Sequence, residues 1–93
     1  MIKTVYQYAK EVTNTRTPWS TFHHAQGEMD ELHNELIRIG TDQDPGPDGV
    51  IGEAADVIIC LLDVLYQCGY SEEQIEEVVT RKCEKWKKLY NGK

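Results

Sequence analysis

The sequence has 93 residues, of which 40% are hydrophobic and 28% are charged, and its formal net charge at pH 7 is -6. This composition is typical of a folded globular protein and argues against a disordered chain. The negative charge argues against general binding to DNA or RNA, because such binding depends on basic surface that neutralises phosphates.

The length indicates one domain, which we take to be residues 1–93. A domain this short buries only a little over ~60% of the surface that its unfolded chain exposes, so its own core is thin. A partner chain is therefore expected.

Neither a membrane-spanning segment nor an export signal is expected. The longest apolar run, Val57 to Leu62, is far shorter than the ~20 residues that a membrane helix needs. The stretch from Met1 to Lys10 has no long apolar core. The cysteines are odd in number and form no C-x-x-C pair, which argues against a disulfide framework or a zinc site. These residues are Cys60, Cys68 and Cys83. We therefore expect a protein of the reducing cytoplasm.

Two helices are predicted in the first part of the chain. Apolar residues at helical spacing predict a helix from about residue 2 to residue 13. They are Ile2, Val5, Ala9 and Val12. A second helix is predicted to begin near Pro18 or Ser20, because proline is tolerated in a first turn, and to end at Gly40. Its apolar residues are Phe22, Met29, Leu32, Leu36 and Ile39.

Residues 41–49 are predicted to form a loop, because two prolines and two glycines interrupt regular structure there. The next segment, from Val50 to Cys68, is apolar nearly all round, which predicts a buried helix. A pair of parallel strands is the competing interpretation of such a run. Its length of about 19 residues favours a helix.

A fourth helix completes the predicted architecture. Gly69 ends the third helix, and Ser71 with Gln74 three residues later forms a capping box that starts the next one. Apolar residues follow at helical spacing: Ile75, Val78, Val79, Cys83, Trp86 and Leu89 or Tyr90. Six of the ten basic residues lie in the last thirteen positions. The predicted fold class is an all-α four-helix bundle.

Three carboxylates interrupt the apolar third helix. Glu53 and Asp56 lie one turn apart on the same side, and Asp63 falls almost in line with them. Burying an ionised carboxylate without a partner costs many kcal/mol in a low-dielectric setting. This stripe of negative charge therefore needs compensation.

The second helix carries a matching set of acids at the same three-and-four spacing: Glu28, Glu31 and Glu35. Two helices packed side by side would place four carboxylates around a common point: Glu28, Glu31, Glu53 and Asp56. The two helices hold only one basic side chain, Arg38, whereas oxygen ligands of this kind suit magnesium or manganese. A solvated acidic face is the alternative interpretation of such spacing.

The sequence around these acids resembles a known superfamily, the MazG-like all-α nucleoside triphosphate pyrophosphohydrolases. Two segments on either side of the proline- and glycine-bearing loop carry the resemblance: GEMDEL at residues 27–32 and GEAADV at residues 52–57. The superfamily includes MazG-like proteins, dimeric dUTPases and phosphoribosyl-ATP pyrophosphohydrolases. The resemblance covers about residues 19 to 90.

The resemblance implies a metal-assisted attack of water on a nucleotide, which releases pyrophosphate and a nucleoside monophosphate. It implies that Glu28, Glu31, Glu53 and Asp56 form the catalytic centre as Mg2+ ligands, with Mn2+ as the alternative ion, and that Lys82 meets phosphate. Magnesium would neutralise the polyphosphate and lower the pKa of the attacking water. The chain departs from the family at Asp30, where a second glutamate is common. It also departs late in the last helix, where the family often has a basic residue and this chain offers Lys87, Lys88 and Asn91.

Further candidate substrate-binding residues each have two interpretations. Trp19 either stacks on a base or anchors a core or an interface. Asn34 either binds a base or sugar edge or is a plain surface residue. Lys85 either meets phosphate or stabilises the end of its helix through the helix dipole. His23 and His24 either touch the nucleotide or lie on the helix surface.

The sequence therefore predicts a four-helix protein that packs as a homodimer or homotetramer, with its site beside the two acidic helices. The predicted reaction is hydrolysis of a deoxy or noncanonical nucleoside triphosphate to the monophosphate and pyrophosphate. Phosphoribosyl-ATP hydrolysis is an alternative that the same metal ligands would serve. A non-catalytic helical interaction or regulatory protein is the alternative outside enzymes. Base and sugar specificity depends on pocket contacts that the sequence does not fix.

Overall fold

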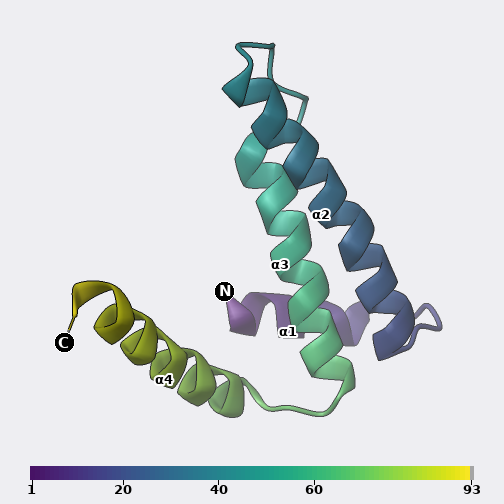
Figure 1. The fold of residues 1–93 in the computed structure, drawn as a ribbon. Helices are drawn as coiled ribbons and strands as arrows, with labels where there is room; N and C mark the ends of the chain where they lie inside the picture. The colour runs from purple at the N-terminus through teal and green to yellow at the C-terminus, as the bar shows by residue number, and fades with distance from the viewer. Residues whose placement is uncertain (93) are drawn as a thin grey trace.

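The protein is described by a computed structural model that covers residues 1–92 and consists of four α-helices (Figure 1). They are α1 (Ile2–Glu11), α2 (Pro18–Gly40), α3 (Gly49–Gln67) and α4 (Glu72–Asn91). Residues 1–92 contain no strand, so the all-α prediction is confirmed. The parallel-strand interpretation of the third segment is wrong. Within these residues no helix is long and apolar enough to span a membrane.

Helices α2 and α3 form an antiparallel hairpin that is the longest arm of the molecule (Figure 1). Ala25 of α2 is only 1% exposed. The loop between them is fastened to α2 by Glu35, whose carboxylate accepts hydrogen bonds from the backbone N–H of Gly46. The small side chain of Ala25 and this loop anchor hold the two helices side by side.

A small core forms where α1 crosses the far end of α3. It consists of Tyr6, Leu62 and Ile75, which come from α1, α3 and the first turn of α4. The Tyr6 hydroxyl also donates a hydrogen bond to the Tyr70 carbonyl, at 2.8 Å. These contacts fix the start of α4 against the base of the hairpin.

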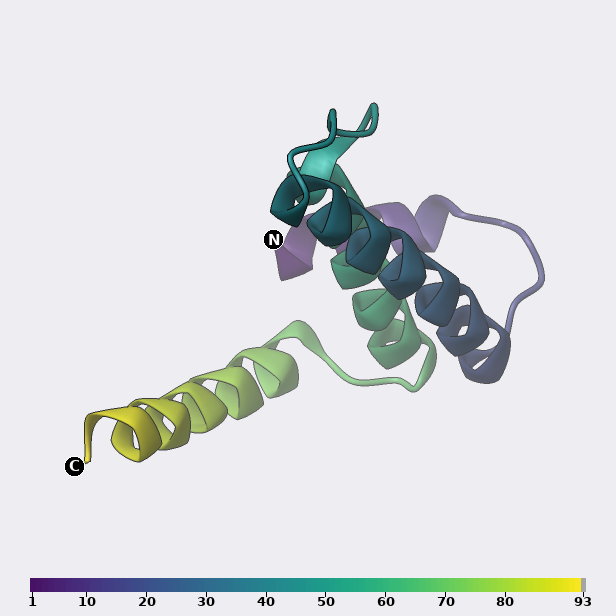
Figure 2. The same ribbon diagram turned by 45° about the horizontal axis from the view of Figure 1, so that its top comes forward.

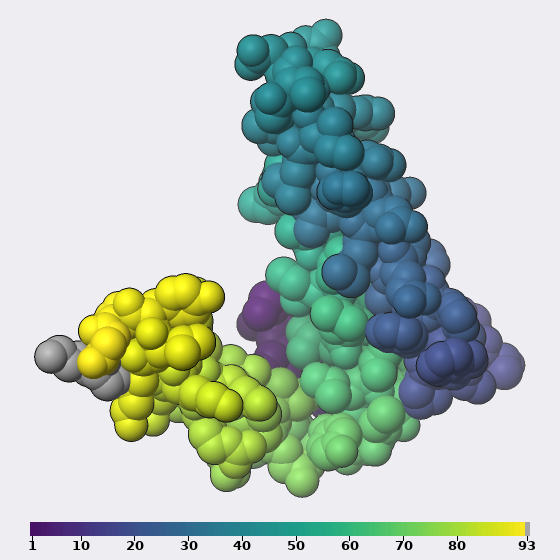
Figure 3. Space-filling model, in the orientation of Figure 1, coloured from purple at the N-terminus to yellow at the C-terminus, as the bar shows by residue number. Residues whose placement is uncertain are grey.

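Beyond this core, α4 projects away from the rest of the chain. Within residues 1–92, Ile75 in its first turn packs with Leu62 of α3, and the rest of α4 lies away from α2 and α3. Figures 1 and 2 show α4 and the hairpin as two diverging arms, and Figure 3 shows the hollow between them. The radius of gyration is 15.7 Å, whereas a compact domain of this length has about 12 Å. The molecule is therefore open.

The helix ends agree closely with those predicted from the sequence. α2 begins at Pro18 with Thr17 as its N-cap, and α4 begins after Ser71 with the predicted capping box to Gln74. α1 ends at Glu11, two residues before its predicted end, because Val12 is already extended. The prediction that the third helix is buried is wrong for a single chain, since Ile51 on α3 is 83% exposed.

Candidate metal centre

The candidate metal centre lies between helices α2 and α3 of the hairpin. Glu28 of α2 and Glu53 and Asp56 of α3 each offer a carboxylate oxygen, and the three oxygens all lie within 4.8 Å of one another. Glu53 and Asp56 share one side of α3 because they are three residues apart. The antiparallel packing of α2 brings Glu28 to the same level. Three of the four predicted ligands therefore converge.

Glu31, the fourth predicted ligand, is exposed at the rim of this cluster. It is near enough to affect both neighbouring glutamates: after loss of water, the largest cause, Glu31 adds to the raised pKa of Glu53 through a side-chain hydrogen bond and its charge, and to that of Glu28 through its charge. Glu31 thus borders the centre without joining the group of three oxygens. Its solvent-exposed position leaves its carboxylate accessible.

Burial and mutual repulsion disfavour the charged forms of these acids. Loss of water around Glu53, followed by the nearby Glu31 carboxylate, raises the pKa of Glu53 from 4.5 to about 7. Loss of water is also the largest cause of the raised pKa of Glu28, with Glu31 and Asp56 adding to it. A cation at this point would oppose both effects.

The donor atoms fit a hard divalent cation. Glu28 Oε2 and Glu53 Oε2 are shielded from solvent and have no hydrogen-bond partner among residues 1–92. Buried polar atoms of this kind normally have one. Within residues 1–92, His24 is the one basic side chain that contacts the cluster: its Nε2 lies 3.2 Å from Glu28 Oε1, and this contact is an ion pair only when the imidazole is protonated. A set made only of carboxylate oxygens suits Mg2+ or Mn2+.

Asp63 belongs to a separate ion pair, although it lies in line with Glu53 and Asp56 on α3. Arg16 donates two hydrogen bonds to its carboxylate, from Nε at 2.7 Å and from Nη2 at 2.8 Å. Sequence reasoning missed this partner, because Arg16 lies in the irregular segment between α1 and α2. Helical periodicity does not predict where the side chains of such a segment point.

A groove of about 680 Å³ lies next to the centre, between α1, the segment after it, and the α2–α3 hairpin. Its walls include Tyr8, Ile59 and Cys60, and its charged pair is Arg16 with Asp63. His24 lines the groove and also contacts Glu28, so the groove and the centre are adjacent. Nothing in the sequence indicated this groove, since its walls come from three separate helices.

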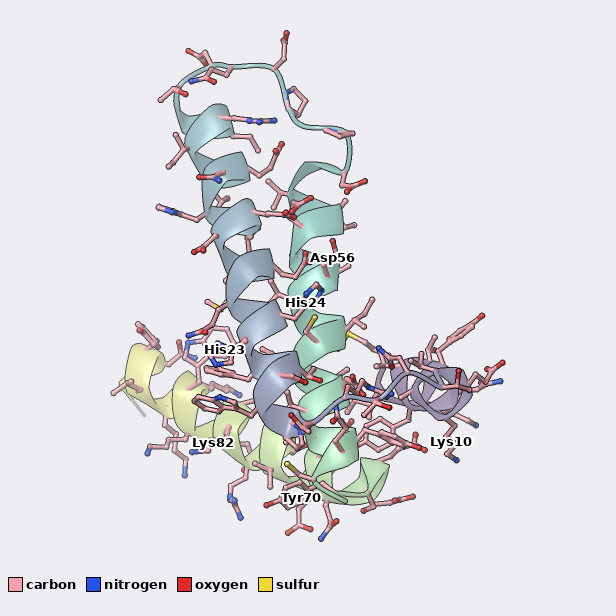
Figure 4. All side chains as sticks on the ribbon, turned by 90° about the vertical axis from the view of Figure 1, so that its right-hand side faces the viewer. Lys10, His23, His24, Asp56, Tyr70 and Lys82 are labelled. Atoms are coloured by element: carbon pink, nitrogen blue, oxygen red, sulfur yellow. The ribbon has the colours of Figure 1, made fainter. Side chains whose placement is uncertain are left out.

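The predicted phosphate-binding lysines lie elsewhere. Lys82 and Lys85 are exposed on α4, whose core contact with the hairpin is made by Ile75 in its first turn. Figure 4 shows Asp56 and His24 along the hairpin and Lys82 on the other arm. Within one chain these lysines do not reach the carboxylates.

The remaining predicted residues lie on α2. Trp19 is exposed at the start of the helix and packs edge-on against the His23 ring, with 4.7 Å between ring centroids. Asn34 is exposed near the other end of α2.

No protein-family model, curated protein or solved structure matches this chain.

Proposed function

We propose that the protein is a magnesium-dependent pyrophosphohydrolase that cleaves a nucleoside triphosphate to the monophosphate and pyrophosphate. The observation that carries this proposal is the convergence of Glu28, Glu53 and Asp56, with two shielded carboxylate oxygens that lack partners. The resemblance of the two acidic segments to the MazG-like superfamily supports the choice of substrate.

The carboxylates would have distinct roles in this reaction. Glu28, Glu53 and Asp56 would hold Mg2+, with Mn2+ as the alternative ion. A bound divalent ion supplies neutralisation of the polyphosphate and a lowered pKa for the attacking water. Glu31 is exposed beside the group of three, so its carboxylate would accept the proton of that water.

The adjacent groove would hold the nucleoside. Its volume of about 680 Å³ lies within the range of about 300–1,000 Å³ that small-molecule sites occupy. Arg16 and Asp63 neutralise each other in its wall, so the groove favours an uncharged, flat and partly apolar group over a second phosphate. His24 lies at the junction, where the sugar would meet the phosphates.

The test is pyrophosphate release from a panel of nucleoside triphosphates and phosphoribosyl-ATP, with and without Mg2+. We expect magnesium-dependent release that Glu53→Gln abolishes and Glu11→Gln, an exposed change on α1, leaves intact. Preference for phosphoribosyl-ATP would assign the alternative substrate to the same centre. Absence of both release and Mg2+ binding in folded protein would reject the enzyme and favour a non-catalytic helical interaction protein.

A further inference from the structure

Arg16, in the wall of the groove beside the candidate metal centre, has no hydrogen-bond donor left for a ligand. Its Nε and Nη2 donate to Asp63, and Nη2 also donates to the Ala9 carbonyl. Its Nη1 donates to the Val12 carbonyl and to Asn14 Oδ1. A guanidinium group has five N–H donors, and these contacts use all of them. Arg16 therefore fastens α1 and the segment after it to α3.

The Asp63 carboxylate, in contrast, keeps an acceptor site free. Among residues 1–92, Asp63 Oδ2 accepts hydrogen bonds from Arg16 and from Gln67 Nε2, the latter at 3.1 Å, whereas Oδ1 accepts from Arg16 alone. A carboxylate has about four acceptor sites, so Oδ1 can accept one more hydrogen bond. Asp63 lines the groove. A ligand in the groove can therefore supply the missing donor.

Thr21 places a hydroxyl group close to this carboxylate. Its side chain lines the groove and is buried, at 8% exposure. Gln67 Nε2 donates to Thr21 Oγ1 at 2.7 Å and also to Asp63, so one amide group joins the two side chains. Within the described part of the chain, the Thr21 hydroxyl accepts this hydrogen bond and donates none. The groove thus has a free donor beside a free acceptor.

The position of Asp63 on α3 relates this pair of groups to the metal centre. Asp63 follows Asp56 by seven residues and shares its side of the helix, about 10 Å further along the axis. That separation is comparable with the length of a nucleoside. With the phosphates held near Asp56, the outer edge of the base would lie at Asp63 and Thr21.

A free acceptor beside a free donor matches an amino group next to an unprotonated ring nitrogen. Cytosine and adenine carry this pair, and a carboxylate accepts well from such an amino group. In uracil a carbonyl oxygen replaces the amino group and would repel the Asp63 carboxylate. The imino N–H of uracil lies between two carbonyl oxygens, so turning the ring still leaves one of them against Asp63.

We propose that the groove selects a base that carries an amino group next to an unprotonated ring nitrogen, as cytosine and adenine do. Asp63 accepts a hydrogen bond from the amino group, and Thr21 donates one to the ring nitrogen. Arg16 and Gln67 hold the two side chains in place. This inference rests on the proposed function, which makes the ligand a nucleotide, and it names the class of base.

Binding of nucleosides tests the base without reference to phosphate or to activity. Isotope-labelled protein is titrated with cytidine and uridine, and with adenosine and purine riboside, which lacks the amino group, while amide chemical shifts are followed by NMR. We expect shifts at Thr21 and Cys60, and in at least one pair the amino nucleoside should bind about tenfold more tightly. The pair that shows the preference identifies a pyrimidine or a purine. Equal binding within both pairs, or no shift in the groove with any nucleoside, would overturn the proposal.

Variants of the two side chains test their roles. Asp63→Asn keeps the shape but replaces an acceptor by an amide that can also donate, so the ratio of the two affinities should fall toward one. Thr21→Val should weaken binding of the amino nucleoside several-fold, and Thr21→Ser, which keeps the hydroxyl, should restore it. Thr80→Val, an exposed change on α4, is the matched control. Wild-type binding and preference in folded Thr21→Val would reject the role of Thr21, even if Asp63→Asn does not fold.

Pyrophosphate release separates this inference from the proposed function. If both hold, kcat/KM with Mg2+ should be at least about tenfold higher for the triphosphate of the preferred base than for its counterpart without the amino group. Magnesium-dependent release without such a preference would keep the enzyme and reject the selection of the base. A preference in nucleoside binding without any release would keep the selection and reject the enzyme.

Discussion

Folding disfavours the ionised form of Glu53 more clearly than that of any other acid described above. Its pKa is raised from 4.5 to about 7 in the folded chain, first by loss of water and then by Glu31. Between these values the folded protein binds more protons than the unfolded chain. The contribution of Glu53 to stability is therefore complete below its unfolded pKa and is lost as the pH rises through about 7.

The melting temperature of the metal-free protein should accordingly fall as the pH is raised from about 5 to about 8. Glu53→Gln removes the titrating group, so this variant should show a smaller fall, and Glu11→Gln should behave as the wild type. Scanning calorimetry in the presence of a chelator measures both. An equal slope for Glu53→Gln and the wild type would contradict the electrostatic account of this residue.

Binding of Mg2+ should offset the unfavourable free energy of the ionised Glu53 carboxylate in the folded protein. A cation favours the ionised carboxylates, so its binding near neutral pH should release protons and raise the melting temperature more at about pH 8 than at about pH 5. Titration calorimetry in buffers of different ionisation enthalpy counts the protons. Binding without proton release would mean that the ion does not contact Glu53.

The ion pair between Arg16 and Asp63 should contribute to the stability of the fold. Arg16→Met removes the two hydrogen bonds that Arg16 donates to the partly buried Asp63 carboxylate and leaves only the one from Gln67, which should lower the free energy of unfolding by about 2 kcal/mol. Adding Asp63→Leu should recover part of the loss. Urea denaturation measures the difference, with Lys10→Met, an exposed change on α1, as the control. A double variant less stable than Arg16→Met would contradict the pairing.

The packing of helix α2 against helix α3 sets the distances between the carboxylates of the candidate metal centre. Ala25, at 1% exposure, lets the helices approach closely, and the Glu35 carboxylate fastens the loop at Gly46. A Cβ atom at Gly46 would come within 2.8 Å of both Glu35 Oε2 and Arg38 Nη1, so only glycine fits there without a shift of these side chains.

Ala25→Leu should push the two helices apart. Overpacking of this kind costs about 1–3 kcal/mol, and it should also weaken Mg2+ binding because Glu28 moves away from Glu53 and Asp56. Gln26→Leu adds the same side chain at the neighbouring exposed position and should keep the wild-type affinity. Titration calorimetry gives the affinity and urea denaturation the stability. Unchanged affinity in folded Ala25→Leu would show that the centre does not depend on this contact.

The open shape has a consequence for the whole molecule. A chain with so much uncovered apolar surface gains stability by association, so its melting temperature should rise with protein concentration. Scans over a hundredfold concentration range test this, and Trp86→Ser should reduce the dependence. A melting temperature independent of concentration, with the mass of a monomer, would contradict association.

The four helices of this protein follow from local features of its sequence. Helical periodicity, Pro18 at a helix start and the Ser71 cap depend on neighbours within one or two turns, so they predicted the four helices to within a few residues. The spacing of Glu53 and Asp56 likewise fixed their shared side of α3. Short-range rules of this kind hold before any tertiary contact forms.

Which acids converge depends on how the helices pack together. Asp63 has the same helical phase as Asp56, yet Arg16 from an irregular segment pairs with it, and Glu31 remains at the rim. The direction of α4 depends on the Tyr6, Leu62 and Ile75 core, which joins residues far apart in the chain. Periodicity gives the side of a helix on which a residue lies, but packing alone decides what faces that side.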